Sequence, residues 1–443
     1  MAARRTITRL AWAALLALAA SPSSSSALAR HPLDDALVEP DFIESLIDMG
    51  LEDALDHLLD QAAADALDPA LRDRARLAVL RVRARDALGD PAVAWPAVDR
   101  LLSTGAAIAQ SARFASYAPA DRARIHADLA EDAYFLRLVG GGLEPLLLFG
   151  VPTEPQHIVA ADAASSIAQH SAAAMNEVAS AIAALEADPA YRDDPLLQAR
   201  RQQLAQDERD RRIAFLRGVG AYLDARGLTK IAGALEGAAP TDDEALLRVA
   251  DRRLDPLESD LDPAIARRAA LYRGLALADL GRFEEAEERF RTVATNEGAG
   301  EYEVLMARLG GVRNRLVNRG PESAEQAIRS IEGRYEAPGP RRDLLAGAAL
   351  RVGLAHARDV RPSDSRRADT LMIDALRRFI RMMRVGPDDA PAWDRRRLAR
   401  ARLARVLTDP LPTHPSPPAL AILARTERLL TQENEPDRAL AVL

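Results

Sequence analysis

Histidine is the side chain that most often does acid–base or metal chemistry near neutral pH, so the chain's seven histidines are the first candidates for a site. They are His31, His57, His126, His157, His170, His356 and His414. No two of them are spaced to bind one metal ion from one helix, and no His-Glu-x-x-His motif occurs. His356 lies between two alanines inside an expected helix, where a packing or surface role is commoner than metal binding. We therefore expect no metal site.

Other catalytic signatures are missing as well. The sequence has no Gly-x-Ser-x-Gly elbow and no Walker-type phosphate loop. Gly218-Val219-Gly220 lacks a third glycine and a preceding strand, which favours helix packing over nucleotide binding. The paired acids at 284–285 and 287–288 are typical of a solvated helix face near a helix start. We expect no enzyme and no cofactor, and an active site assembled from distant residues is the alternative.

Two clusters have the chemistry to hold a partner. The first is an arginine-rich helix, which predicts a site for an anion or acidic peptide or, alternatively, a solvated face paired with acids on its neighbours. Its arginines are Arg395, Arg396, Arg397, Arg400, Arg402 and Arg405. The second is the apolar run 146–149, which follows three glycines. The run is typical of an apolar plug that covers the ends of adjacent helices. Docking to a partner or to a membrane surface is the alternative.

Composition indicates how such residues are positioned. Hydrophobic residues make up 48% of the 443 positions but aromatic residues only 4%, so alanine, leucine and valine must build the core. No run of alternating β-branched residues predicts a strand, and we expect an all-α protein. The absence of cysteine excludes disulfides and thiolate sites. A net charge of −7 argues against nucleic-acid binding.

The N-terminus has the features of an export signal. Three arginines at 4, 5 and 9 precede a short apolar stretch at 10–20, and Ala27-Leu28-Ala29 fits the small-x-small cleavage pattern. We predict cleavage after Ala29, with a retained anchor as the alternative, and no membrane span in the cleaved chain. The Arg4-Arg5 pair leaves the twin-arginine route open beside the general one. The expected location is the periplasm, the cell envelope or the exterior.

Periodicity divides the rest of the chain into three parts. Residues 30–139 predict degenerate helix pairs, with helices at 69–87 and 118–138 and another that starts near Pro96. Residues 140–226 predict a loop and a long helical hairpin, in which 194–225 is the second arm. The first arm carries a near-heptad stripe that indicates a core or, alternatively, a dimer contact. The stripe consists of Ile167, Ser171, Ala174, Val178, Ile182 and Leu185. Residues 227–443 predict further helix pairs.

The clearest pair covers 269–298. Its first helix is expected to end at Gly281, and Phe290 is expected to fill the gap left by small residues such as Gly274 and Ala286. This pattern resembles a tetratricopeptide repeat. A weaker copy occupies 368–393, where Ala375, Phe379, Pro387 and Trp393 follow the family's order.

The resemblance implies a right-handed α-solenoid of degenerate repeats, interrupted by the long hairpin. It places Arg268, Leu271, Leu275, Ala278 and Asp279 on the groove-facing side of one helix. The Lys and Asn set with which some family members bind peptide C-termini is absent, so a helix or an extended peptide is the expected ligand.

The expected function is therefore a non-enzymatic scaffold that binds a protein or peptide on its concave face. Arg268, Leu271, Leu275, Asp279, Arg397 and Arg400 are the candidate contact residues. The alternative is a self-assembling envelope component that forms homo-oligomers through the hairpin and the apolar C-terminal end.

Overall fold

The computed structural model describes residues 40–49, 51–60, 67–88, 91–140, 143–144, 146–149, 154–192, 194–208, 211–226, 243–260, 262–335 and 340–383. Every regular element in these ranges is helical and none is a strand, which confirms the all-α prediction. The export segment 1–29 and the arginine cluster 395–405 lie outside the described residues. The chain forms two compact units, Met1–Ala75 and Arg76–Leu443, and each is described by itself.

The first unit contains α3 (Pro40–Met49), α4 (Glu52–Asp60) and the start of α5 (Pro69–Ala87). Its core is built from the apolar faces of these helices. The side chains of Ile43 and Leu55 are almost fully buried, and the Arg74 guanidinium lies 2.9 Å from the Glu44 carboxylate.

The second unit begins within α5 and continues through α6 (Pro91–Gln110), the short 3₁₀ turn η2 (Ala112–Ser116) and α7 (Pro119–Asp132). The expectation that a helix starts near Pro96 was wrong, because α6 starts at Pro91 and Pro96 lies inside it. A proline inside a helix removes one backbone hydrogen bond and its ring crowds the preceding turn, but burial of the following residues can offset that cost. The buried Val98 and Leu101 hold the helix beyond that point.

A π-helix, η3 (Ala133–Val139), continues α7. Each π-turn holds one more residue than an α-turn, so side chains after Asp132 leave the α-helical register. The sequence predicted one regular helix over 118–138, and this change of register was missed because π-turns have no clear sequence signature.

The long hairpin is present, but its second arm consists of two helices. The first arm is α9 (Glu154–Glu186), and α10 (Pro195–Glu208) and α11 (Arg211–Ala225) pack against it. The predicted stripe is buried except for Leu185, which is half-buried. Val178 and Ile182 form a cluster with Ala123 of α7. The helix-packing glycines are confirmed, because a Cβ at Gly220 would lie 3.3 Å from Ala168 of α9.

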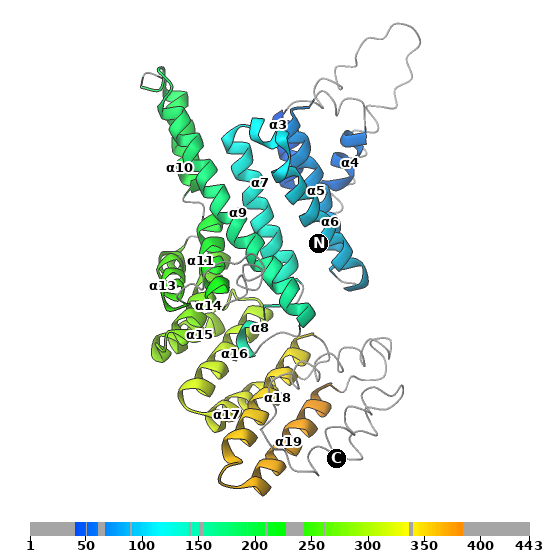
Figure 1. Ribbon diagram of the computed structural model, residues 1–443, viewed down its shortest axis with the longest axis vertical. Coiled ribbons are helices and arrows are strands. Elements are labelled where there is room, and N and C mark those ends of the chain that lie inside the picture. Colours follow the sequence, from blue (N-terminus) through cyan, green and yellow to red (C-terminus); the bar gives the residue numbers. More distant parts are fainter. Residues whose placement is uncertain are drawn as a thin grey trace. The chain divides into compact units, whose positions relative to one another are not determined.

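The remaining helices follow one another as a stack (Figure 1). They are α13 (Asp243–Leu254), the 3₁₀ turn η4 (Asp255–Ser259), α14 (Pro263–Asp279), α15 (Phe283–Thr295), α16 (Glu301–Asn318), α17 (Pro321–Glu332), α18 (Pro340–Val360) and α19 (Ser365–Met383). From α13 to α19 each α-helix packs against the next, and α16 also contacts both α14 and α18.

The predicted contact around Phe290 is confirmed and extends over three helices. The ring lies on α15, and a Cβ added at Gly274 of α14 would approach it to 2.8 Å. A Cβ at Gly310 of α16 would approach the same ring to 2.5 Å. The first helix of the pair was predicted to end at Gly281, and α14 ends two residues earlier, at Asp279. Gly281 lies in the turn that follows, with a φ of 75° that glycine adopts without strain. Glycines therefore set how closely α14, α15 and α16 pack.

Candidate functional site

The most unusual side chain of the described residues is Glu144, a carboxylate with no exposed surface. It accepts hydrogen bonds from the hydroxyls of Tyr272 and Tyr302, both at 2.9 Å. The Arg268 Nη1 donates to both of its oxygens, at 2.9 and 3.1 Å. Tyr134 completes the ring of donors at 3.4 Å. A buried carboxylate is costly unless it is paired and hydrogen-bonded, and this arrangement meets both conditions.

The donors come from three separate elements. Tyr134 lies on η3, Arg268 and Tyr272 on α14, and Tyr302 at the start of α16. Arg268 and Tyr272 are four residues apart, so they share one face of their helix. We call these four residues the carboxylate pocket.

Backbone hydrogen bonds bring Glu144 to the pocket. The amide of Gly140 donates to the Phe135 carbonyl at 2.9 Å, which closes the last π-turn of η3. The amides of Leu143 and Glu144 then both donate to the Leu138 carbonyl, at 2.9 and 3.2 Å. The chain therefore folds back on the end of η3, and Glu144 faces the same pocket as Tyr134.

The pocket's charges balance one another. Burial opposes the charge of Arg268, but Tyr134, Glu144, Tyr272 and Glu303 outweigh that effect and raise the guanidinium pKa. Burial, followed by the charge of Glu144, raises the pKa of the Tyr272 and Tyr302 hydroxyls. The tyrosines therefore stay protonated at neutral pH and donate to the carboxylate.

Aromatic rings enclose one side of the pocket. The Tyr134 ring meets Phe215 of α11 edge to face, with centroids 5.3 Å apart, and lies 6.0 Å from the Tyr272 ring. Tyr222 of α11 packs against Tyr272 at 5.9 Å. These rings keep water away, which strengthens the hydrogen bonds to Glu144.

A short apolar helix follows Glu144. It is α8 (Leu146–Phe149), which packs against α16 (Figure 1). Leu147 and Leu148 are buried, and the Leu147 amide donates to the Glu144 carbonyl at 3.1 Å. Leu143, Glu144 and α8 are here called the docked segment. Its carboxylate bonds to α14 and α16, and α8, with its two buried leucines, packs against α16.

The candidate residues predicted on α14 are all in contact with the rest of the chain. Arg268 belongs to the carboxylate pocket, while Leu271 and Leu275 have at most 1% of their surface exposed. Asp279 accepts a hydrogen bond from Tyr222 at 3.1 Å and pairs with Arg313 of α16. The face expected to line an open groove is covered here by α11 and α16. Arg397 and Arg400 lie outside the described residues.

Sequence reasoning missed the pocket itself. The available signal was a lone acid, Glu144, within the apolar stretch 143–149. Its partners Tyr134, Tyr272 and Tyr302 are three of only seven tyrosines, but they are far apart in the sequence. Only the folded chain brings them together.

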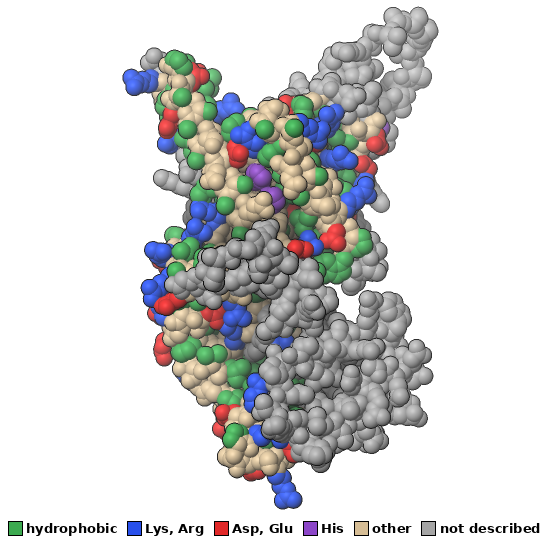
Figure 2. Space-filling model, viewed as in Figure 1, with side chains coloured by type: hydrophobic (Ala, Val, Ile, Leu, Met, Phe, Trp, Pro, Cys, Tyr) green, Lys and Arg blue, Asp and Glu red, His purple; other side chains and the backbone are tan. Residues whose placement is uncertain are grey.

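A second polar cluster joins α7 and α9. The Nδ1 atoms of His126 and His170 are 3.0 Å apart and their rings are stacked, so one ring donates to the other. Burial, followed by the neighbouring His126, lowers the pKa of His170 to about 4. Histidine side chains reach the surface over this region (Figure 2). His356, in contrast, is buried with its Nδ1 2.6 Å from Glu325, which fits the packing role predicted for it.

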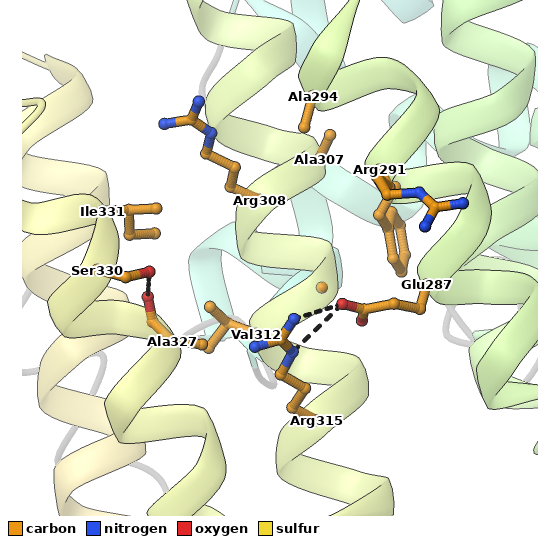
Figure 3. Close-up of a pocket in the computed structure, with 12 residues that line it drawn as sticks. Glu287, Arg291, Ala294, Ala307, Arg308, Val312, Arg315, Ala327, Ser330 and Ile331 are labelled. Carbon is orange, nitrogen blue, oxygen red and sulfur yellow. Dashed lines mark hydrogen bonds and ion pairs between the residues drawn. The ribbon is translucent and has the colours of Figure 1, made fainter.

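A surface pocket of about 230 Å³ lies between α15, α16 and α17 (Figure 3). Phe290 contributes to its lining, and Arg291, Arg308 and Arg315 surround it. Arg315 pairs with Glu287 across the pocket at 2.6 Å, which neutralises part of the positive charge. The pocket therefore offers a weakly basic surface.

No helix in the described part of the chain is long and apolar enough to cross a bilayer. Nor do three or more histidine, cysteine, aspartate or glutamate side chains within those ranges gather as a metal site requires. A scan against protein-family models found no match, and searches of curated proteins and of solved structures found none either.

Proposed function

We propose that this protein is a non-enzymatic scaffold that binds another protein or peptide on the concave face of a right-handed, tetratricopeptide-like solenoid, along α16 and α18 and the part of α14 that holds the docked segment. Helices α13 to α19 pack in sequence, and the contacts of α16 with α14 and α18 fit one continuous wall of such a stack. The fit of Phe290 against Gly274 and Gly310 supports the same assignment.

The observation that carries the proposal is the docked segment. Helices α14 and α16 already hold a short peptide of this chain: both bond to its carboxylate, and α16 packs against the helix that carries its two buried leucines. A surface that binds such a peptide within the chain has the chemistry to bind one from another protein.

The remaining parts of the proposal rest on the sequence. The N-terminal segment 1–29 favours export to the periplasm, the envelope or the exterior, and the composition favours a protein partner over nucleic acid. We propose no cofactor, because no cofactor-binding motif occurs in the sequence.

Site-specific photocrosslinking tests the function. A benzophenone amino acid replaces Glu301, which is exposed on α16 beside Tyr302, in the full-length chain expressed in its native cells. Illumination should give a discrete protein adduct that mass spectrometry identifies.

The matched control carries the same amino acid at Leu196, which is 78% exposed on α10 and lies outside the stack α13–α19. We expect no adduct there. Equal labelling from both positions, or no adduct from position 301, would refute binding along these helices.

A further inference from the structure

The docked segment presents its contacts with the spacing of one helical turn. Glu144 precedes α8, whose buried Leu147 and Leu148 follow it at i+3 and i+4. The Leu147 amide donates to the Glu144 carbonyl at 3.1 Å, which closes one turn of chain between them. Apart from the backbone bonds to Leu138, its polar contacts are made by the carboxylate pocket. The segment therefore presents one carboxylate and two leucines within about one turn of chain, which is enough to define a short peptide motif.

We propose that the docked segment is a built-in competitor, and that the partner presents an acidic residue followed by leucines at i+3 and i+4, whose carboxylate replaces that of Glu144 in the carboxylate pocket. This inference rests on the proposed function and names the chemistry of its partner.

The pocket requires an anion. If Glu144 leaves and nothing replaces it, the buried hydroxyls of Tyr272 and Tyr302 lose their acceptor. Arg268 then keeps Glu303, a carboxylate that also pairs with Arg267, so the positive charge there is only partly balanced. A partner that brings a carboxylate restores these charge-assisted bonds, whereas a purely apolar peptide does not. Charge complementarity therefore selects an acidic ligand.

The segment is built to detach. The helix α8 has four residues, far fewer than an isolated helix needs for stability, so its conformation depends on docking. Because the docked segment belongs to the same chain as the pocket, its effective concentration there is on the order of millimolar. A separate peptide therefore competes poorly until the contacts of the docked segment are weakened.

The test measures fluorescence anisotropy with a labelled synthetic peptide of residues 142–150 and the full-length protein. Glu144→Gln keeps the size of the side chain but removes its charge. We expect the peptide to bind this variant at least about tenfold more tightly than the wild type. A peptide with glutamine in place of its own glutamate should bind the variant about tenfold more weakly.

Two further variants show whether the peptide binds in the carboxylate pocket. Adding Tyr302→Phe to Glu144→Gln removes one donor and should weaken binding about threefold to tenfold. The control is Glu131→Gln, which removes an acid of α7 that pairs with Arg212 outside the pocket, and it should bind the peptide as the wild type does.

Equal affinity for the wild type and a folded Glu144→Gln protein would overturn the proposal, as would an unweakened glutamine peptide. If the Glu144→Gln variant does not fold, amide hydrogen exchange of the wild-type protein tests whether the peptide displaces the docked segment. Excess peptide should speed exchange of the Leu143, Glu144 and Leu147 amides, which are hydrogen-bonded in the docked state, and unchanged exchange would refute displacement.

The remaining alternative is that the segment of a second copy of this chain fills the pocket, and light scattering tests it. A wild-type dimer that the peptide converts to monomer would assign the pocket to a second copy's segment and overturn the assignment to a partner. If adducts form at position 301 while the peptide results fail, only this inference is lost. If neither is seen, the proposed function is lost as well.

Discussion

At the scale of single residues, arginine holds the buried acids of the stack. Arg268 joins Glu144 to Glu303, and Arg273 of α14 pairs with Asp251 at 2.7 Å and with Glu258 at 3.1 Å. The planar guanidinium donates to several carboxylates at once, which a lysine ammonium does not do with the same geometry. A chain with a single lysine, Lys230, thus uses arginine to connect neighbouring helices.

The His126–His170 pair makes stability depend on pH. In the folded protein the pKa of His170 is lowered to about 4, whereas an unfolded histidine titrates near 6.5. Below pH 6.5 the unfolded chain therefore binds a proton that the folded chain excludes, and stability falls until the pH reaches about 4. We expect the wild type to lose up to about 3 kcal/mol more than His170→Gln between pH 6.5 and 4.

Urea unfolding of the two proteins at several pH values measures this difference. Asp132 has its pKa raised to about 6, first by burial, and this acts in the opposite direction in both proteins, so it cancels from the comparison. His57→Gln, at an exposed position of α4, is the matched control. Parallel pH curves for the wild type and His170→Gln would contradict the expectation.

At the scale of helices, glycine positions determine which neighbours approach closely. Gly310 faces the Phe290 ring, whereas a Cβ at the adjacent Gly311 would meet only a Glu287 oxygen at an ordinary 3.6 Å. Gly310→Ala should therefore destabilise the protein by about 1–3 kcal/mol through overpacking. Gly311→Ala should be neutral or stabilise by up to about 1 kcal/mol, because alanine favours helix.

Urea denaturation followed by circular dichroism distinguishes the two substitutions. Adding Phe290→Leu to Gly310→Ala should recover part of the loss, since the smaller side chain leaves room for the new methyl group. Equal effects of the two alanines would show that the Phe290 contact does not limit the approach of α16.

The helices themselves were largely predictable, because proline and glycine mark their ends. Pro263 follows Asp262, whose side chain caps α14, and Gly320 with a φ of 86° precedes α17 at Pro321. The π-helix was not predictable. Tyr134 and Leu138 on it are fully buried, and local propensity does not report such tertiary burial.

At the scale of the molecule, prediction succeeded where contacts are local and failed where they are not. The Phe290 contact lies within neighbouring helices, and its small-residue pattern predicted it. The carboxylate pocket joins residue 134 to residue 302, and no local pattern reports that pairing. The contact of Asp279 with Tyr222 of α11 was missed for the same reason, because the two residues are 57 positions apart in the sequence.

The long range of the carboxylate pocket also has a kinetic consequence. Tyr302 and Glu144 are 158 positions apart, while most helices of the stack contact their sequence neighbours. Contacts that close long loops form late in folding, because the chain loses conformational entropy before they stabilise it. Tyr302→Phe should therefore speed unfolding and leave the refolding rate nearly unchanged.

Stopped-flow refolding and unfolding over a range of urea concentrations measures both rates. Phe290→Leu, which weakens contacts between adjacent helices, is the comparison and should slow refolding. If Tyr302→Phe slows refolding as much as it lowers stability, the pocket forms early. The expected result makes Glu144 and its donors the last contacts to close as the protein folds and the first to open.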